Sequence, residues 1–296
     1  MRLVNRHPGA MPAFVLGLIP FALLIIVYAM ASQERLAENP NDKLLPGIEQ
    51  MAAAVDRMAF KEDRRSGDYL MWVDTLASLE RLGLGVGVAA LLALLVGILN
   101  GVLPVVRASL APLVSAASMI PPLAILPILF IVFGLGELSK VMLIVIGTAP
   151  IMMRDVAQRV RELPQEQFIK IQTLGANSWQ MVTRMVLPQI LPRLIDAVRL
   201  SLGPAWLFLI AAEAIASTEG LGYRIFLVRR YLAMDVILPY VIWITVLAIV
   251  IDQCLRFTTG RPDEHTLTRP DQVDGFDHAF LYLDVIVGPI FGTCQA

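Results

Sequence analysis

The side chains that could perform chemistry are few and scattered. Three histidines occur, His7, His265 and His278, and only His265 has acidic neighbours, Asp263 and Glu264. A metal site needs several such ligands converging on one point. We therefore expect no metal site, and we interpret the segment around His265 as a solvated tail.

The other reactive residue types give no catalytic pattern. Cys254 and Cys294 form neither a CxxC pair nor a disulfide framework. Paired acids, or a nucleophile beside a base, do not stand out. The Walker A patterns GxxxxGKS and GxxxxGKT of ATP-binding proteins do not occur. The sequence therefore predicts that the chain is not an enzyme, with no catalytic residue and no cofactor of its own.

The composition is that of an integral membrane protein. Of 296 residues, 57% are apolar and 17% are charged, and the mean hydropathy is +0.68. A soluble domain could not bury so much apolar surface. The formal net charge is -1 and no basic block occurs, which excludes a nucleic-acid groove. About six runs have the length that crosses a bilayer, namely residues 11–31, 82–103, 110–133, 140–153, 194–216 and 236–257.

Two of these runs have features beyond their hydropathy. Run 82–103 contains small residues that let helices approach closely in lipid, so we expect it to pack in the interior; they are Gly83, Gly85, Gly87, Gly97 and Gly101. Run 11–31 follows Arg2 and Arg6, and either a retained membrane anchor or a signal peptide fits it.

Prolines interrupt run 110–133. Pro121, Pro122 and Pro127 remove backbone donors and break a helix. Broken backbone survives at membrane depth only against protein or water. The run is therefore predicted to line a translocation pathway, although a tolerated kink is the alternative. The predicted pathway residues are Ser118, Pro121, Pro122, Glu213 and Ser217.

Glu213 lies in the apolar stretch LFLIAAEAIAS. A carboxylate in the middle of a bilayer costs at least about 2.5 to 3.5 kcal/mol, so its side chain must face protein or water. A pathway or gating role and an internal contact between helices both fit. Elsewhere, Asp252 and Arg256 have the spacing of a local pair on one helix, and Asp196 and Arg199 indicate a polar network.

The distribution of basic residues indicates the orientation. Arg2 and Arg6 precede the first run, and segment 154–193 is rich in Arg and Lys. Basic segments stay in the cytoplasm, so both termini and this loop are predicted to be cytoplasmic. Residues 32–81 then lie outside, where residues 48–60 form an amphipathic helix on the membrane or a solvated linker.

Segment 154–193 predicts two short helices at a sharp bend. Gln165 to Thr173 can form the first helix, Leu174-Gly175-Ala176 a turn, and Asn177 the N-cap of the second helix, with Gln180 three residues on. A docking element for another protein and a simply ordered loop are both compatible with this pattern.

The same segment resembles the cytoplasmic coupling loop of importer-type ABC permeases. That family has a Glu-Ala-Ala, three residues, Gly, nine residues, Ile-x-Leu-Pro consensus, and this chain matches it at Gly175 and at Leu187-Pro188. It departs at Ile169-Lys170-Ile171, where Glu-Ala-Ala is expected, and at Met185, where Ile is expected. The acidic residue of the consensus is therefore missing.

Residues 121–140 and 206–222 resemble the nitrate, sulfonate, taurine and bicarbonate importer permeases. The similarity covers about residues 70–257. It divides the chain into a first membrane helix with a periplasmic segment (1–70), the permease core (71–257) and an atypical tail (258–296).

The resemblance implies an all-α, polytopic fold of about six transmembrane helices, the type I ABC importer permease fold with a cytoplasmic coupling helix, in the bacterial inner membrane. It implies transport of a small, anionic, nitrate-, sulfonate- or taurine-like solute. It also implies ATPase subunits that bind ATP and Mg, a periplasmic or lipid-anchored solute-binding protein, and a second permease copy. The implied ATPase-coupling residues are Gln172, Thr173, Leu174, Gly175, Ala176, Asn177, Leu187 and Pro188.

Two glycine-rich turns are predicted on the opposite side of the membrane. Gly136 with Glu137, and Gly220 with Gly222, either contact the binding protein or form tight connections. A stand-alone secondary transporter or channel remains the alternative function. It would be typified by an inverted repeat of broken helices, which the sequence does not display.

Overall fold

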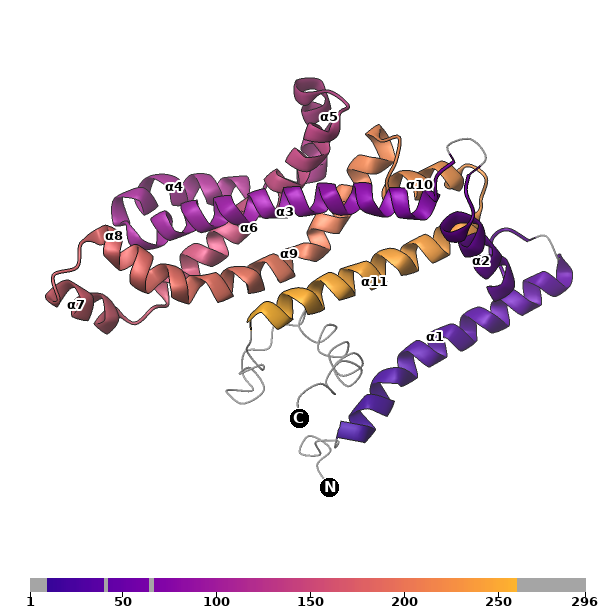
Figure 1. The fold of residues 1–296 in the computed structure, drawn as a ribbon, viewed down its shortest axis with the longest axis horizontal. Coiled ribbons are helices and arrows are strands. Elements are labelled where there is room, and N and C mark those ends of the chain that lie inside the picture. The colour runs from indigo at the N-terminus through magenta and orange to yellow at the C-terminus, as the bar shows by residue number, and fades with distance from the viewer. Residues whose placement is uncertain (1–9, 40–41, 64–66, 260–296) are drawn as a thin grey trace. The chain divides into compact units, whose positions relative to one another are not determined.

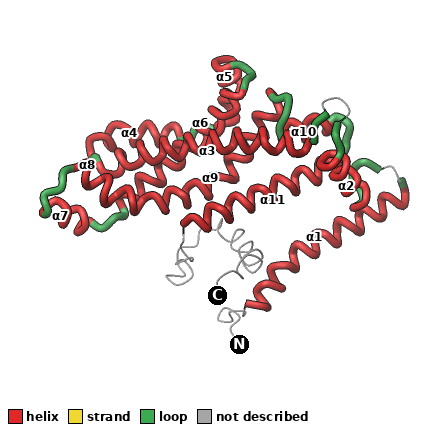
Figure 2. The backbone as a smooth tube through the Cα atoms, in the orientation of Figure 1, coloured by secondary structure: helices red, strands yellow, loops and turns green. Residues whose placement is uncertain are grey.

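The structure is a computed structural model that describes residues 10–39, 42–63 and 67–259, and its regular elements in these ranges are all helical (Figures 1 and 2). The described residues divide into two compact units, the first with those before residue 49 and the second with those from residue 49 onward. The predicted tail, 258–296, lies outside the described residues except for its first two, as do the three histidines.

The first unit contains the long helix α1 (Ala10–Glu38). The Tyr28 hydroxyl donates to the Pro46 carbonyl at 2.8 Å, and the Ser32 hydroxyl donates to the Leu45 carbonyl at 3.0 Å. The chain after α1 therefore folds back along its last turns. The helix extends past residue 31, where its apolar run ends, to Glu38.

The second unit is a helical bundle. Its elements in chain order are α2 (Ile48–Val55), the π-helical turn η2 (Asp56–Phe60), α3 (Leu70–Val102), α4 (Pro104–Ala117), α5 (Pro122–Phe133), α6 (Glu137–Arg161), α7 (Gln165–Thr173), α8 (Ser178–Met181), the π-helical turn η3 (Val182–Val186), α9 (Leu187–Ala216), α10 (Leu221–Arg229) and α11 (Met234–Thr259). Helices α7 and α10 lie at opposite ends of this bundle (Figure 1). We call these ends the α7 end and the α10 end.

In the described residues, five helices are long and apolar enough to cross a membrane, and the pair α4–α5, bent by 95°, makes a sixth when it is counted as one broken span. The predicted number of spans is thus confirmed. The second span begins at Leu70 rather than at residue 82. Its first turns contain Asp74, Ser78 and Arg81, which lower the hydropathy of the segment but are buried against polar partners.

Helices α3 and α6 run parallel and pack through glycines. A Cβ on Gly97 would lie 2.7 Å from Val156, and one on Gly101 would lie 2.5 Å from Val160. Gly85 meets Ile144 in the same way. The predicted interior packing is confirmed for these three glycines but is wrong for Gly83 and Gly87, which face open space.

The bent pair α4–α5 returns the chain between these two parallel helices. Because α3 and α6 both start at the α10 end, the segment between them must lead back from the α7 end (Figure 1). The prolines that break this span are tolerated because α4 packs on α3 and α6, and α5 packs on α6 and α9.

Within the bundle, helix α9 packs on α11. Arg199 of α9 donates two hydrogen bonds to Asp252 of α11, at 2.8 and 3.0 Å, and lies 4.0 Å from Asp196. The expected polar network near Asp196 is therefore present. Asp252 thus forms an ion pair that joins two helices, and its predicted pair with Arg256 on its own helix stays a prediction.

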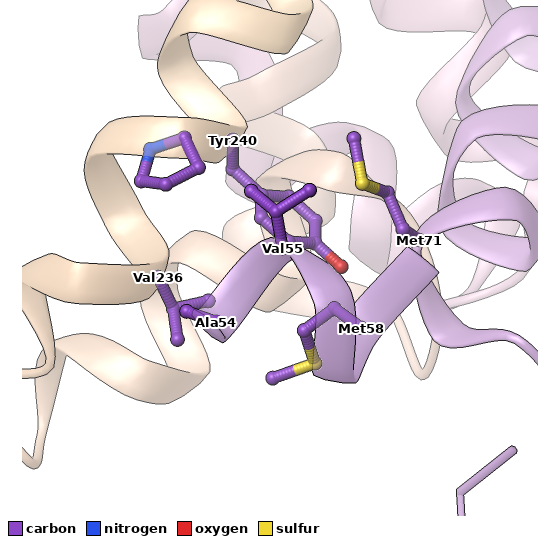
Figure 3. A pocket seen from close by; sticks show the side chains of 7 residues that line it. Ala54, Val55, Met58, Met71, Val236 and Tyr240 are labelled. Atoms are coloured by element: carbon purple, nitrogen blue, oxygen red, sulfur yellow. The ribbon is translucent and has the colours of Figure 1, made fainter. Parts of the chain in front are cut away.

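Residues 49–60 pack onto α3 and α11. Ala54 and Met58 line a small apolar pocket together with Met71, Val236 and Tyr240 (Figure 3). The Trp72 indole donates to the Ala59 carbonyl at 3.1 Å, and Arg57 lies 3.7 Å from Asp235. Ala54 and Ala59 thus cover protein, which corrects the expectation of a solvated linker, whereas Phe60 is exposed and the predicted position on the membrane surface stays a prediction.

Candidate functional site

The segment between α6 and α9 forms a compact bend at the α7 end. Gly175 has a φ of +78°, and a Cβ there would meet nothing within 4 Å, so the backbone conformation, not packing, favours glycine. The Gly175 amide donates to Gln172 and the Ala176 amide to Ile171, which closes α7 in a Schellman pattern. The predicted turn is confirmed.

Helix α8 begins with the predicted cap. Asn177 Oδ1 accepts from the Gln180 amide at 2.8 Å, and Gln180 Oε1 accepts from the Asn177 amide at 3.1 Å. This reciprocal pair is a capping box. It fixes the direction in which the chain leaves the bend.

The bend presents apolar side chains outward. Leu174 is 78% exposed and Trp179 is 74% exposed, and Ile169 is exposed beside them. Phe168 and Ile171 pack inward against the core. The bend is thus anchored on one face and offers an uncovered apolar face on the other. Sequence reasoning missed Ile169 and Trp179, although apolar residues in a polar loop are a usable signal.

The loop is shorter than the predicted 154–193. Helix α6 continues to Arg161, and α8, η3 and α9 form one continuous helix from Ser178 to Ala216. The π-helical turn η3 lies just before Pro188, which cannot donate a backbone hydrogen bond, and a widened turn accommodates that loss. Leu187 and Pro188 therefore belong to the start of α9.

A cluster of charged side chains is buried at the α10 end. Glu213 is 0% exposed, and its carboxylate accepts from Ser78 at 2.8 Å, from Arg81 at 2.7 Å and from the Gly222 amide at 2.8 Å. Of the two interpretations of Glu213, the internal contact between helices is the one that the structure displays. Its pathway role stays a prediction, and the side chain has no surface for a solute in this conformation.

Arg81 extends the cluster to α6. Its guanidinium also donates to Glu137 and, at 2.9 Å, to the Glu219 carbonyl. The Lys140 ammonium donates to Glu137 at 2.7 Å and to the Ser217 hydroxyl at 3.2 Å. Both cations are almost completely buried, whereas the Glu137 side chain is 62% exposed.

Asp74 holds the loop before α10. Its carboxylate accepts from the Gly220 amide at 2.9 Å, from Arg224 at 2.7 Å and from the Tyr240 hydroxyl at 3.2 Å. Burial alone would lower the pKa of Arg224, but its hydrogen bond and charge interaction with Asp74 outweigh burial and raise the pKa. Arg224 is therefore held as a cation.

The buried charge cluster comprises three acidic and three basic residues, of which Asp74, Glu213, Arg81 and Lys140 are buried, Arg224 is half-buried and Glu137 is exposed at its edge. Sequence reasoning missed four of them. Asp74, Arg81 and Arg224 fell in polar flanks outside the apolar runs, and Lys140 opened one.

The structure corrects part of the predicted binding-protein contact. Gly220 and Gly222 are buried against Glu213 and the backbone of Ile210, so neither offers an exposed surface. Gly136 and Glu137 are exposed. The predicted contact with a binding protein therefore stays a prediction for Gly136 and Glu137.

The other predicted pathway residues lie at the corner between α4 and α5. Pro121 and Pro122 start α5 at the 95° bend. The Ser118 hydroxyl donates to the Ser115 carbonyl at 2.8 Å and accepts from Arg154 of α6 at 2.9 Å. The break in the span is thus confirmed, whereas its role in lining a pathway stays a prediction. Ser217 lies apart from the corner, in the buried charge cluster.

Comparisons with known proteins agree with this architecture. Residues 85–258 match the family described as "Binding-protein-dependent transport system inner membrane component". The Escherichia coli taurine transport system permease protein TauC is 37% identical over 190 residues, 64% of this chain and 69% of its own length. The putative aliphatic sulfonates transport permease protein SsuC of Bacillus subtilis is 30% identical, covering 67% and 71% of the two chains. A bicarbonate transport system permease protein, CmpB of Synechococcus elongatus, is 31% identical, covering 64% and 69%.

A solved structure shows the same fold. A chain of the MetNI methionine ABC transporter, in an inward facing conformation, superposes with a TM-score of 0.55 at 21% identity and covers 66% of this chain and 94% of its own. The predicted type I ABC importer permease fold is confirmed. The chain belongs to the family of binding-protein-dependent transport system inner membrane components, as a multi-pass permease of the nitrate, sulfonate, taurine and bicarbonate group.

Proposed function

We propose that this chain is the membrane-spanning subunit of an ABC importer for a small anionic solute of the sulfonate or taurine kind. The observation that carries this proposal is the bend at residues 169–179, because it is held rigidly by its own capping bonds and still leaves Leu174 and Trp179 uncovered. An exposed apolar patch on an ordered element is typical of a docking surface. The names of the similar permeases supply the solute class.

A membrane-spanning subunit of this kind works with several partner proteins. Two ATPase subunits bind ATP and Mg and receive the bend, a solute-binding protein delivers the solute at the α10 end, and a second permease copy completes the pathway. This chain performs no hydrolysis. The termini and the α7 end are cytoplasmic. The residues that contact the ATPase are Gln172, Thr173, Leu174, Gly175, Ala176, Asn177, Leu187 and Pro188, together with Ile169 and Trp179.

The continuous helix from Ser178 to Ala216 connects the two ends of the subunit. It starts at the capping box and ends beside Glu213, in the buried charge cluster. Closure of the ATPase subunits on ATP moves the bend, and this helix carries the movement to the α10 end. Coupling of this kind requires that the partner contacts the two conformations differently.

The experiment is uptake by proteoliposomes that contain the permease, its ATPase and its binding protein, with ATP hydrolysis measured in parallel. Gly175→Val should abolish uptake while hydrolysis continues, because a β-branched residue disfavours a positive φ. Gly175→Asn is the matched control, since asparagine tolerates that conformation. Normal uptake by Gly175→Val would contradict the coupling role.

The same preparation tests the alternative function. Uptake by the permease alone, without the ATPase and without ATP, would support a secondary transporter or channel and would overturn the proposal. Mass spectrometry of the molecule bound to the isolated binding protein then identifies the solute.

A further inference from the structure

Arg154 is a cation aimed at the break in a membrane span. It lies on α6, and its Nη1 donates to the Ser118 hydroxyl at 2.9 Å. Ser118 occupies the corner where α4 and α5 meet at 95°. The guanidinium therefore reaches the irregular backbone that interrupts this span, where the sequence predicts the pathway.

Arg154 forms no ion pair within the described part of the chain. Its neighbour Asp155 lies 3.5 Å from Arg159, which also lies 3.7 Å from Glu162. The acids nearest to it in sequence are thus directed to another cation. Charged residues inside spans are normally paired, and a cation that is not paired indicates a functional site.

Three other cations of the bundle that join helices differ in this respect, and Arg107 of α4, which also has no carboxylate partner among the described residues, is half-buried and donates to the Asn100 and Gly101 carbonyls. Arg81, Arg199 and Arg224 each bind a carboxylate at 2.7 or 2.8 Å. Beside each of these three guanidinium groups, a carboxylate already occupies the position that a solute anion would take. Arg154 has only a neutral hydroxyl partner and is exposed, so its charge is uncompensated and its remaining donors can bind another group.

We infer that Arg154 is the anion-binding residue of the translocation pathway, where it takes the sulfonate or other oxyanion group of the solute at the α4–α5 corner. This inference rests on the proposed function, which supplies an anionic solute. A guanidinium is planar and presents paired donors that match an oxyanion. An anion is a stronger partner than a hydroxyl, so the arriving solute displaces Ser118, and Ser118 holds the side chain between passages.

Transport of radiolabelled taurine, ethanesulfonate and bicarbonate by the full complex in proteoliposomes tests the inference. Arg154→Gln should lower uptake by at least about tenfold, the loss expected when a charge-assisted hydrogen bond is removed. Binding of the same probes to the detergent-solubilised complex should weaken in parallel. Arg154→Lys keeps the charge and should restore part of both. Arg159→Gln, on the same helix, is the matched control and should leave both unchanged.

If the hydrogen bond between Arg154 and Ser118 only held α6 to the α4–α5 corner, the variants would lose uptake differently. If Arg154 only positions the corner, Ser118→Ala removes the same hydrogen bond and should cause the same loss as Arg154→Gln. The inference instead requires a smaller loss for Ser118→Ala. Equal losses in these two variants, or wild-type uptake by Arg154→Gln, overturn it while the proposed function stands. A wild-type complex that transports none of the three probes with ATP overturns both.

Discussion

Gly220 lies directly against the carboxylate of Glu213, so that a Cβ at position 220 would stand 2.6 Å from Glu213 Oε1. The φ of Gly220 is +125°, a conformation that L side chains rarely adopt. The backbone of Gly220 and the buried Glu213 carboxylate are therefore in close contact, and the conformation of the loop before α10 depends on both residues.

Removal of the Glu213 carboxylate should destabilise the permease. Glu213→Ala leaves Arg81 buried without one of its two acidic partners, and breaking such a pair costs about 3 to 5 kcal/mol. Thermal unfolding of the detergent-solubilised protein, followed by tryptophan fluorescence, measures this loss. Glu213→Gln keeps the hydrogen-bonding shape and should lose less. Equal unfolding temperatures for wild type and Glu213→Ala would show that the cluster contributes little to stability.

The glycines at the contact between α3 and α6 should not tolerate replacement by larger residues. Gly101→Val would place its side chain where Val160 lies, and overpacking of this kind costs about 1 to 3 kcal/mol or more. Gly87→Val makes the same chemical change on the open face of α3. Expression in membranes and the unfolding temperature should fall for Gly101→Val only. A similar loss in both variants would indicate an effect of helix propensity rather than of packing.

The capping box should contribute to both local stability and coupling. Asn177→Ala removes the side-chain acceptor for the Gln180 amide, a loss of about 1 kcal/mol. Faster amide exchange in residues 174–181 should report the change, together with less uptake per ATP hydrolysed. Asn177→Ser retains a capping oxygen and should behave nearly as wild type. Unchanged exchange in Asn177→Ala would contradict the role of the cap.

Much of the bend at the α7 end could be predicted from the sequence, because its determinants are local. A turn glycine at 175, a capping residue at 177 and its partner at 180 act within a few residues of one another. The same holds for the break at Pro121 and Pro122. In such cases the residue type itself restricts the backbone, and the structure agrees with the prediction.

The buried charge cluster could not be predicted in the same way. Asp74 and Arg224 are far apart in the sequence, as are Ser78 and Glu213, and only the packing of α3 on α9 and α10 brings them together. A hydropathy window counts Asp74 and Arg81 as polar and therefore starts the span after them, at residue 82 instead of Leu70. The predicted start of the second span is thus wrong because charged residues next to the apolar run belong to the same helix.

The glycine contacts of α3 also restrict how this subunit can change shape. Val156 and Val160 lie on Gly97 and Gly101, so a slide of α6 by one helical turn, about 5.4 Å, would press Val156 onto Ala93 or leave Val160 without its glycine. Helices α3 and α6 must therefore move as a single rigid body. A change of conformation must therefore occur at two other places, namely the 95° corner between α4 and α5 and the short loop before α10.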